Sequence, residues 1–223
     1  MKEPREKVNI YETLFFGILL AASGGLMDAY SFLGRGGVFA NAQTGNILLL
    51  GVNISRGEWS EAVRFLLPIA AFSLGIAISA LSQTAITKKD VSPRTVKSLL
   101  LTAETVIFTS VAFIPADNIA NALISFACGI QLEAFGTISA TNVATTMCIG
   151  NLRSSINCAA AYFSGRDRSA MRRSLVYFTM IISFIVGAVI GGALIDACGR
   201  YAILGCTAIA SVCALIVIFG RKK

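Results

Sequence analysis

Two acidic residues lie inside stretches that otherwise have the composition of membrane-spanning helices. Asp28 follows Leu14 by 14 positions, and Glu133 follows Ile119 by the same number, so each carboxylate is about 21 Å along its span. A carboxylate at that depth is costly unless it is paired, hydrated or protonated. Such a group can take up a proton or a cation and later release it, as ion-coupled transport requires. The alternative is that both acids only accept hydrogen bonds that brace the helices.

Polar residues also interrupt two apolar segments, "ANAQTGN" and "TNVATTMCIGN". Broken helices place peptide dipole ends at membrane depth, where ions or polar solutes can bind. Besides the two acids, the candidate solute- or ion-binding residues are therefore Asn41, Gln43, Thr44, Gly45, Asn46, Asn142, Thr145, Gly150 and Asn151. The alternative is a tight helix crossing, with small residues for close approach and amides that bond between helices. Arg153 is expected to extend to the cytoplasmic face or to pair with an acid.

The composition is that of a membrane protein, with a mean hydropathy of +0.73 and 14% charged residues, against about 25% in soluble domains. Two apolar stretches, Val38–Ile54 and Asn142–Tyr162, are interrupted. The uninterrupted ones are each near the roughly 20 residues that cross a bilayer; they are Leu14–Leu33, Arg64–Ile86, Ser98–Pro115, Ile119–Ile138, Leu175–Ile195 and Tyr201–Phe219. We therefore predict an all-α membrane protein with six transmembrane helices and two re-entrant or broken segments.

The chain has a net charge of +7, and most of its 19 basic residues lie in four clusters. We interpret these clusters as signals for the orientation of the protein in the membrane, and we expect no nucleic-acid partner. The clusters are Lys2/Arg5/Lys7, Lys88/Lys89/Arg94/Lys97, Arg166/Arg168/Arg172/Arg173 and Arg221/Lys222/Lys223. Short cytoplasmic loops collect Lys and Arg. All four clusters face the cytoplasm only if the interrupted segments do not cross, which places both termini in the cytoplasm. With eight crossings, the second cluster would be external. Contact with anionic membrane lipids follows as a secondary consequence.

An internal repeat relates the two halves of the chain. "SGGLMDAYSFL" matches "CGIQLEAFGTI" at an offset of 105, which aligns Asp28 with Glu133 and Asn46 with Asn151. Each half, approximately 12–115 and 117–220, contains three expected crossings, so the second half starts on the opposite side of the membrane. A single membrane domain over residues 1–223 with an inverted repeat is therefore predicted. The alternative is chance similarity between helices rich in Gly and Ala.

Several chemistries are excluded or disfavoured by the residue inventory. The chain has no histidine, and it contains neither G-x-x-x-x-G-K-[ST] nor G-x-S-x-G. Its six cysteines form no C-x-x-C pair, so no metal site, cofactor or disulfide framework is expected. Glu104 has no counterpart in the repeat and is expected to be structural. The glycines Gly187, Gly191 and Gly192 are expected to pack either between the two halves or between two copies of the chain.

The stretch "DAYSFL…GGVFANAQTGNILLLG" resembles the YoaK family of bacterial inner-membrane proteins. The residues that carry the resemblance are Asp28, Gly37, Phe39, Thr44, Gly45 and Asn46. The spacing of the other apolar segments fits as well, so the resemblance covers essentially the whole chain. It implies a multi-pass protein of the bacterial cytoplasmic membrane, and it implies no substrate.

Together these features predict a secondary transporter or channel for a small solute or ion, coupled to protons or cations through Asp28 or Glu133. A second hypothesis, from a different functional class, is that the protein is a non-transporting scaffold or partner subunit. An intramembrane enzyme that uses carboxylates alone is a further alternative, and we expect no enzymatic activity.

Overall fold

The computed structural model describes residues 9–89, 91–165 and 167–220, and nearly all of them are helical. The long elements are α1 (Leu14–Gly34), α2 (Gln43–Ser55), α3 (Trp59–Lys89), α4 (Pro93–Val111), α5 (Asp117–Ala134), α6 (Cys148–Phe163), α7 (Ala170–Cys198) and α8 (Leu204–Phe219). The short elements are the 3₁₀ turns η1 (Ile10–Glu12) and η2 (Gly199–Ile203) and the antiparallel strands β1 (Thr137–Ile138) and β2 (Thr141–Asn142). The predicted all-α class is confirmed.

The small hairpin of β1 and β2 was not predicted from the sequence. The span expected to end at Ile138 ends instead at Ala134, where the chain leaves α5. Ser139 and Ala140 join the strands with positive φ angles of 50° and 57°, as both central residues of a type I′ turn require. The Asn-Gly or Asp-Gly pair that usually announces such a turn is missing here, so the sequence offered no signal for it.

Three helical runs in the described part of the chain are long and apolar enough to cross a membrane. They are Leu14–Gly34, Trp59–Thr84 and Ala170–Phe219. The last run contains α7, η2 and α8, and the chain turns between them at Gly199, which has a φ of +54°. The lengths and composition of these helices are therefore those of a membrane protein.

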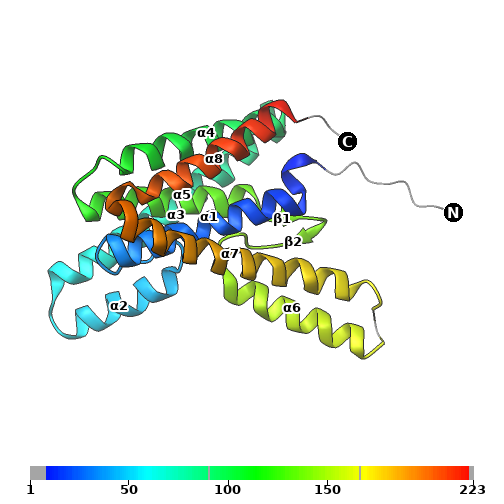
Figure 1. Cartoon of the computed structure of the whole chain (residues 1–223), viewed down its shortest axis with the longest axis horizontal. Coiled ribbons are helices and arrows are strands. Elements are labelled where there is room, and N and C mark those ends of the chain that lie inside the picture. Colours follow the sequence, from blue (N-terminus) through cyan, green and yellow to red (C-terminus); the bar gives the residue numbers. More distant parts are fainter. Residues whose placement is uncertain (1–8, 90, 166, 221–223) are drawn as a thin grey trace.

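The two most extensive helix pairs each combine one helix from either half of the chain. Helix α1 packs along α7 and α3 packs along α5, whereas α2 lies against α3, α6 against α7 and α4 against α8. In Figure 1, α2 and α6 start near the centre of the molecule and run towards opposite ends. The two segments expected to be interrupted thus meet at the middle of the fold.

Glycines allow the backbones of the two long pairs to approach closely. A Cβ atom at Gly25, Gly187, Gly75 or Gly129 would lie 1.9 to 2.2 Å from a carbonyl oxygen of the facing helix. Those oxygens belong, in the same order, to Phe184, Ala22, Phe126 and Phe72. Any side chain at these positions would force the helices apart. Gly187 was expected to pack either between the two halves or between two copies of the chain, and the structure supports packing between the halves.

Basic side chains satisfy carbonyl groups at the C-terminal ends of neighbouring helices. Arg94 donates to the carbonyls of Val217 and Ile218 at 2.5 and 2.7 Å, and Lys97 donates to that of Ala134. The last carbonyls of a helix have no partner within it, so these contacts join the start of α4 to the ends of α8 and α5.

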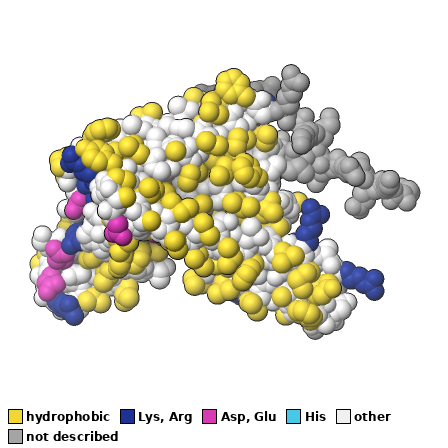
Figure 2. All heavy atoms as spheres, in the orientation of Figure 1, with side chains coloured by type: hydrophobic (Ala, Val, Ile, Leu, Met, Phe, Trp, Pro, Cys, Tyr) yellow, Lys and Arg dark blue, Asp and Glu magenta, His cyan; other side chains and the backbone are white. Residues whose placement is uncertain are grey.

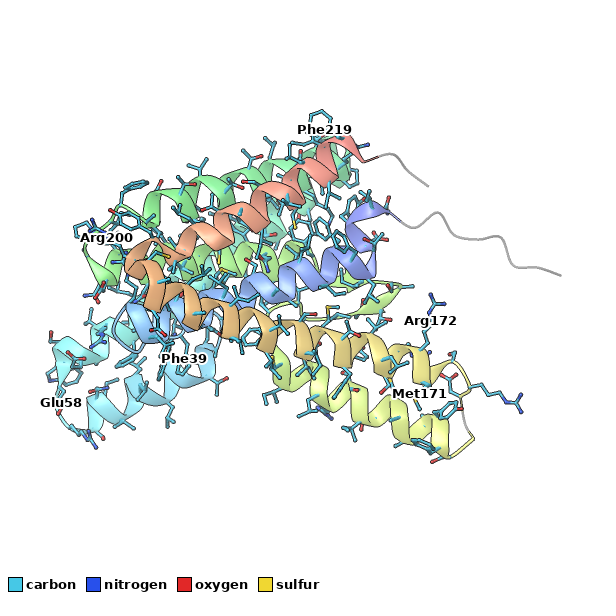
Figure 3. The ribbon with its side chains drawn as sticks, viewed as in Figure 1. Phe39, Glu58, Met171, Arg172, Arg200 and Phe219 are labelled. Carbon is cyan, nitrogen blue, oxygen red and sulfur yellow. The ribbon has the colours of Figure 1, made fainter. Side chains whose placement is uncertain are left out.

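The ends of the molecule differ in charge. Figure 3 shows Glu58 and Arg200 at one end and Arg172 and Phe219 at the other, and in Figure 2 the visible acidic side chains lie at the Glu58 end.

At the Arg172 end, a hydrogen-bonded ion pair with Arg173 lowers the pKa of Asp167 to about 2. Other members of the basic clusters lie outside the described residues; they are Lys2, Arg5, Lys7, Arg166, Arg221, Lys222, Lys223 and the side chains of Lys88 and Lys89.

The close contact between α1 and α7 predicts that Gly187→Ala destabilises the protein. The added methyl group would lie 1.9 Å from the Ala22 carbonyl oxygen, and such overpacking costs about 1–3 kcal/mol or more. Gly192→Ala is the matched control on the same helix, because its nearest contact would be 3.9 Å away. Thermal unfolding in detergent should give a lower midpoint for Gly187→Ala than for the control; equal midpoints would contradict the packing.

Candidate solute-binding cavity

A cavity of about 420 Å³ lies between the first turns of α2 and α6. Its walls come from α1, α7 and the two interrupted segments, and they include Asp28, Asn41, Thr44, Thr146, Ile149 and Phe184. Figure 2 shows that the surface is hollowed between the part formed by α2 and the part formed by α6. The fold thus brings together two polar stretches that are about one hundred residues apart in the sequence.

Asp28 connects the cavity to the backbone in front of α2. Its side chain is buried, and its Oδ1 atom accepts a hydrogen bond from the backbone N–H of Asn41 at 2.7 Å. The side-chain amide of Asn41 in turn donates to the Gly24 carbonyl at 3.1 Å. Asp28 therefore braces the loop, and it also presents a carboxylate to the cavity.

Two cavity residues carry polar atoms that have no hydrogen-bond partner within the described part of the chain. These atoms are Oδ1 of Asn41 and Oγ1 of Thr146, in side chains that are 1% and 2% exposed. A buried polar atom without a partner costs about 1–3 kcal/mol. Both atoms are themselves buried, and a polar group brought into contact with them would recover that free energy.

The asparagines of the two G-N pairs have a structural role. Asn46 Oδ1 accepts from the backbone N–H of Phe39 at 3.0 Å, and its Nδ2 donates to the carbonyl of the same residue at 2.7 Å. Asn151 makes the same pair of bonds with Ala144, at 3.2 and 2.6 Å. Each side-chain amide thus pairs with the backbone seven residues earlier, as a neighbouring strand would. We call these two arrangements the asparagine clamps.

The remaining candidates of the first segment have different roles. Gln43 donates to the Ala40 carbonyl at 2.8 Å and accepts from Asn46 at 2.8 Å, so it reinforces the clamp. A Cβ atom at Gly45 would lie 2.7 Å from the Phe39 ring, which explains the glycine. Thr44 lines the cavity.

In the second segment, Gly150 has open space around the position of a Cβ atom and lines the cavity. Thr145 is buried and its hydroxyl has no partner within the described residues, but it does not line the cavity. Gly45 and Gly150, which are also 105 residues apart, therefore differ: Gly45 makes room for a ring, whereas Gly150 lines the cavity.

The structure does not bring Glu133 to Asp28. Glu133 is exposed and, with Asn142 and Lys97, lines a separate pocket of about 550 Å³. The sequence alignment pairs the two acids, but α5 ends at Ala134, directly after Glu133, whereas α1 continues to Gly34. Glu133 therefore lies at a helix end, and the cavity contains one carboxylate of the expected pair.

Comparison with known proteins assigns the chain to a family. The profile described as "Protein of unknown function (DUF1275)" matches residues 16–216. The chain belongs to this family. It is also 26% identical, over 180 residues, to the UPF0700 transmembrane protein YoaK of Bacillus subtilis (strain 168), covering 77% of this chain and 79% of that protein. No solved structure matches the chain. The resemblance carried by the T-G-N stretch is thus confirmed, and this DUF1275 protein is a helical membrane protein.

Sequence reasoning missed two walls of the cavity in this DUF1275 protein, and it could not choose between two neighbouring threonines. Thr145 and Thr146 both belong to the second polar segment, and only the turn before α6 decides that Thr146 lines the cavity. Phe184 belongs to α7, and nothing in the sequence linked it to the polar segments. Phe39, labelled in Figure 3, was noted only for the family resemblance and forms another wall.

Glu104 and the six cysteines are further potentially reactive groups. Within the described ranges, no group of three or more His, Cys, Asp or Glu side chains is placed to hold a metal ion. The six cysteines are free thiols. Glu104 is fully buried on α4 and does not line the cavity, and neither of its carboxyl oxygens has a partner among the described residues.

The clamps predict that Asn46→Ala and Asn151→Ala each lower stability. Each substitution leaves a backbone N–H and a carbonyl without their partner, at a cost of about 1–3 kcal/mol. Asn157→Ala is the control, because Asn157 is exposed on the same helix as Asn151. Thermal unfolding of the purified proteins should separate both clamp variants from the control; a control that unfolds as early as they do would argue against the clamps.

Proposed function

We propose that this DUF1275 protein is a secondary transporter or channel for a small solute or ion, and that the cavity between α2 and α6 is its binding site. The observation that carries the proposal is the pair of buried, unpartnered atoms, Asn41 Oδ1 and Thr146 Oγ1, beside the Asp28 carboxylate. Small-molecule sites have this character, with mostly apolar walls and a few convergent polar groups. A cavity that only separated two helices would need no such groups.

The helix ends at the cavity support this function. Helix α2 begins at Gln43 and α6 begins at Cys148, and neither N-terminus has a side-chain cap. In α2, the backbone N–H groups of Gln43 and Gly45 donate to the carbonyls of Asn41 and Ala42, so the start of α6 is the more open of the two. The first N–H groups of a helix have no partner within it, and they carry the positive end of its dipole. Discontinuous helices that present such ends near the membrane midplane are a common basis for solute sites in transporters.

The course of the chain supports six crossings and two re-entrant segments. Helix α2 starts at the cavity and runs back towards the end of the molecule where α1 finishes, and α6 runs back towards the end where α5 finishes (Figure 1). Each therefore reaches one surface only. The crossings would then be α1, α3, α4, α5, α7 and α8, which leaves both termini on the same side, in the cytoplasm by the distribution of basic residues.

Matching contacts support an inverted repeat. The packing of α1 on α7 corresponds to that of α5 on α3, and the packing of α2 on α3 corresponds to that of α6 on α7. The asparagine clamps of Asn46 and Asn151 recur at the offset of 105 that the sequence alignment uses. A chance resemblance between glycine-rich helices would not reproduce a hydrogen-bond pattern.

Of the two carboxylates predicted to couple transport to protons or cations, we assign this role to Asp28. It is buried at the cavity, where a bound proton or cation would change the charge next to a solute. Glu133 is exposed and lines the other pocket. The alternative of a non-transporting scaffold draws support from the clamps, which account for Asn46 and Asn151 without a solute, but it gives the cavity no role.

Asp28→Asn should abolish solute-driven proton movement, whereas Glu133→Gln should not. The measurement uses proteoliposomes that enclose a pH-sensitive dye and receive amines, carboxylates or amino acids outside. We expect a decrease of about tenfold or more for Asp28→Asn, because a single carboxylate serves the cavity. Thr146→Val, which removes a hydroxyl without changing the side-chain shape, should decrease the flux as well. Undiminished flux in Asp28→Asn would remove this carboxylate from the mechanism.

Cysteine labelling tests the proposed topology. In a background without native cysteines, Ser92→Cys between α3 and α4 should react with a membrane-impermeant maleimide only from the cytoplasm. Ala116→Cys, between α4 and α5, should react only from outside. Both positions are exposed, so differences in labelling report the side of the membrane. External labelling of Ser92→Cys would instead favour eight crossings.

A further inference from the structure

Arg153 extends the candidate cavity along α6. Ile149 and Gly150 line the cavity, and Arg153 follows them by four and three residues. Residues at these spacings share one face of a helix, about one turn apart. Arg153 is exposed, and it forms no hydrogen bond or ion pair with the described residues. Arg153 is not itself a wall of the cavity, but it lies one helical turn from two residues that are.

The position of this charge along α6 is unfavourable without a partner. Arg153 precedes the end of the helix at Phe163 by ten residues, or about 15 Å, which is further than its side chain extends. The neighbouring Leu152 and Ile156 expose 43% and 60% of their surface. A charge at membrane depth among apolar side chains requires a counter-charge, and such residues commonly mark solute pathways.

The two sides of the cavity offer opposite hydrogen-bonding character. On the α6 side lie Arg153, the uncapped first N–H groups of the helix and the unpartnered hydroxyl of Thr146, which is 2% exposed. These groups suit an anion. On the opposite side lie the Asp28 carboxylate and the unpartnered Oδ1 of Asn41, both of which only accept hydrogen bonds when Asp28 is ionised. These groups suit a cation or a hydrogen-bond donor.

We propose that the ligand is a small zwitterion, with its ammonium group at Asp28 and Asn41 and its anionic group at the start of α6 and Arg153. The inference rests on the proposed function of the cavity. A zwitterion would neutralise both protein charges in one binding event and would itself cross with no net charge. The volume of about 420 Å³ and the rings of Phe39 and Phe184 leave room for an apolar substituent.

An ammonium group joined to an oxyanion occurs both in free amino acids and in the headgroup of phosphatidylethanolamine. The opening of the cavity between α2 and α6 gives access to either source. The test therefore compares soluble and lipid ligands on the same preparation of the full-length protein in detergent. The quantities measured are the dissociation constant by calorimetry and the midpoint of thermal unfolding.

The soluble ligands form a matched set with one apolar body. Leucine carries both charges, 3-methylbutylamine lacks the carboxylate, and 4-methylpentanoate lacks the amine; glycine and phenylalanine vary the apolar part. We expect at least one of these amino acids, or phosphatidylethanolamine, to bind about tenfold or more tightly than its single-charge analogue. Phosphatidylglycerol is the anionic lipid control. Preference for phosphatidylethanolamine over all three amino acids would identify the lipid as the source.

Two variants test which charged residue of the protein contacts which charged group of the ligand. Arg153→Gln should lose the preference for the zwitterion over the amine by about tenfold, and Asp28→Asn should lose the preference over the carboxylate to a similar extent. Arg172→Gln, an exposed arginine near the start of α7, is the matched control and should bind as the parent does. The unfolding midpoint without ligand shows whether each variant is folded.

The outcomes separate this inference from the proposed function. If the amine or the carboxylate alone binds as tightly as every zwitterion, and Asp28→Asn weakens that binding, the cavity is a solute site and the zwitterion inference is wrong. If Arg153→Gln leaves zwitterion binding unchanged, the role of Arg153 is wrong. If no ligand binds and proteoliposomes show no flux, both proposals are wrong.

Discussion

A helix that begins inside a membrane protein must leave backbone polar groups without helical partners, and this protein meets that cost with two asparagine side chains. Asn46 and Asn151 each bond both the N–H and the carbonyl of a residue seven positions earlier. The backbone before α2 and α6 is thereby held in a defined path by side chains of the protein itself. The rest of the site depends on this, because the clamped segments carry its walls.

The cavity is lined both by polar side chains that are hydrogen-bonded within the chain and by polar side chains that retain an atom without a partner among the described residues. At the start of α2, the side chain of Gln43 lines the cavity and is hydrogen-bonded within the chain. At the cavity, Asn41 and Thr146 retain atoms without a partner in the described chain. The combination of rigid clamps and free polar atoms is the arrangement that a preorganised binding site needs.

The pairing of helices across the halves also limits how such a protein can move. Glycine contacts hold α1 to α7 and α3 to α5, so each pair takes one helix from each half. Because close backbone contact leaves little room for sliding, rearrangement would more easily occur where α2 and α6 meet at the cavity. Alternating access through movement of repeat-related parts is the mechanism described for inverted-repeat transporters, and the two short helices border the proposed solute site.

The sequence by itself determined the helical membrane class, the approximate limits of each helix, the family and the two interrupted segments, because hydropathy and polar interruptions are local properties. It also determined that Asn46 and Asn151 correspond, since both follow a glycine in one register. Only the tertiary structure decided that Asp28 borders the cavity while Glu133 lies at a helix end, because that depends on where α5 stops. It alone revealed Phe184 and the different environments of Gly45 and Gly150. These are distances between helices that are remote in sequence, and no local pattern encodes them.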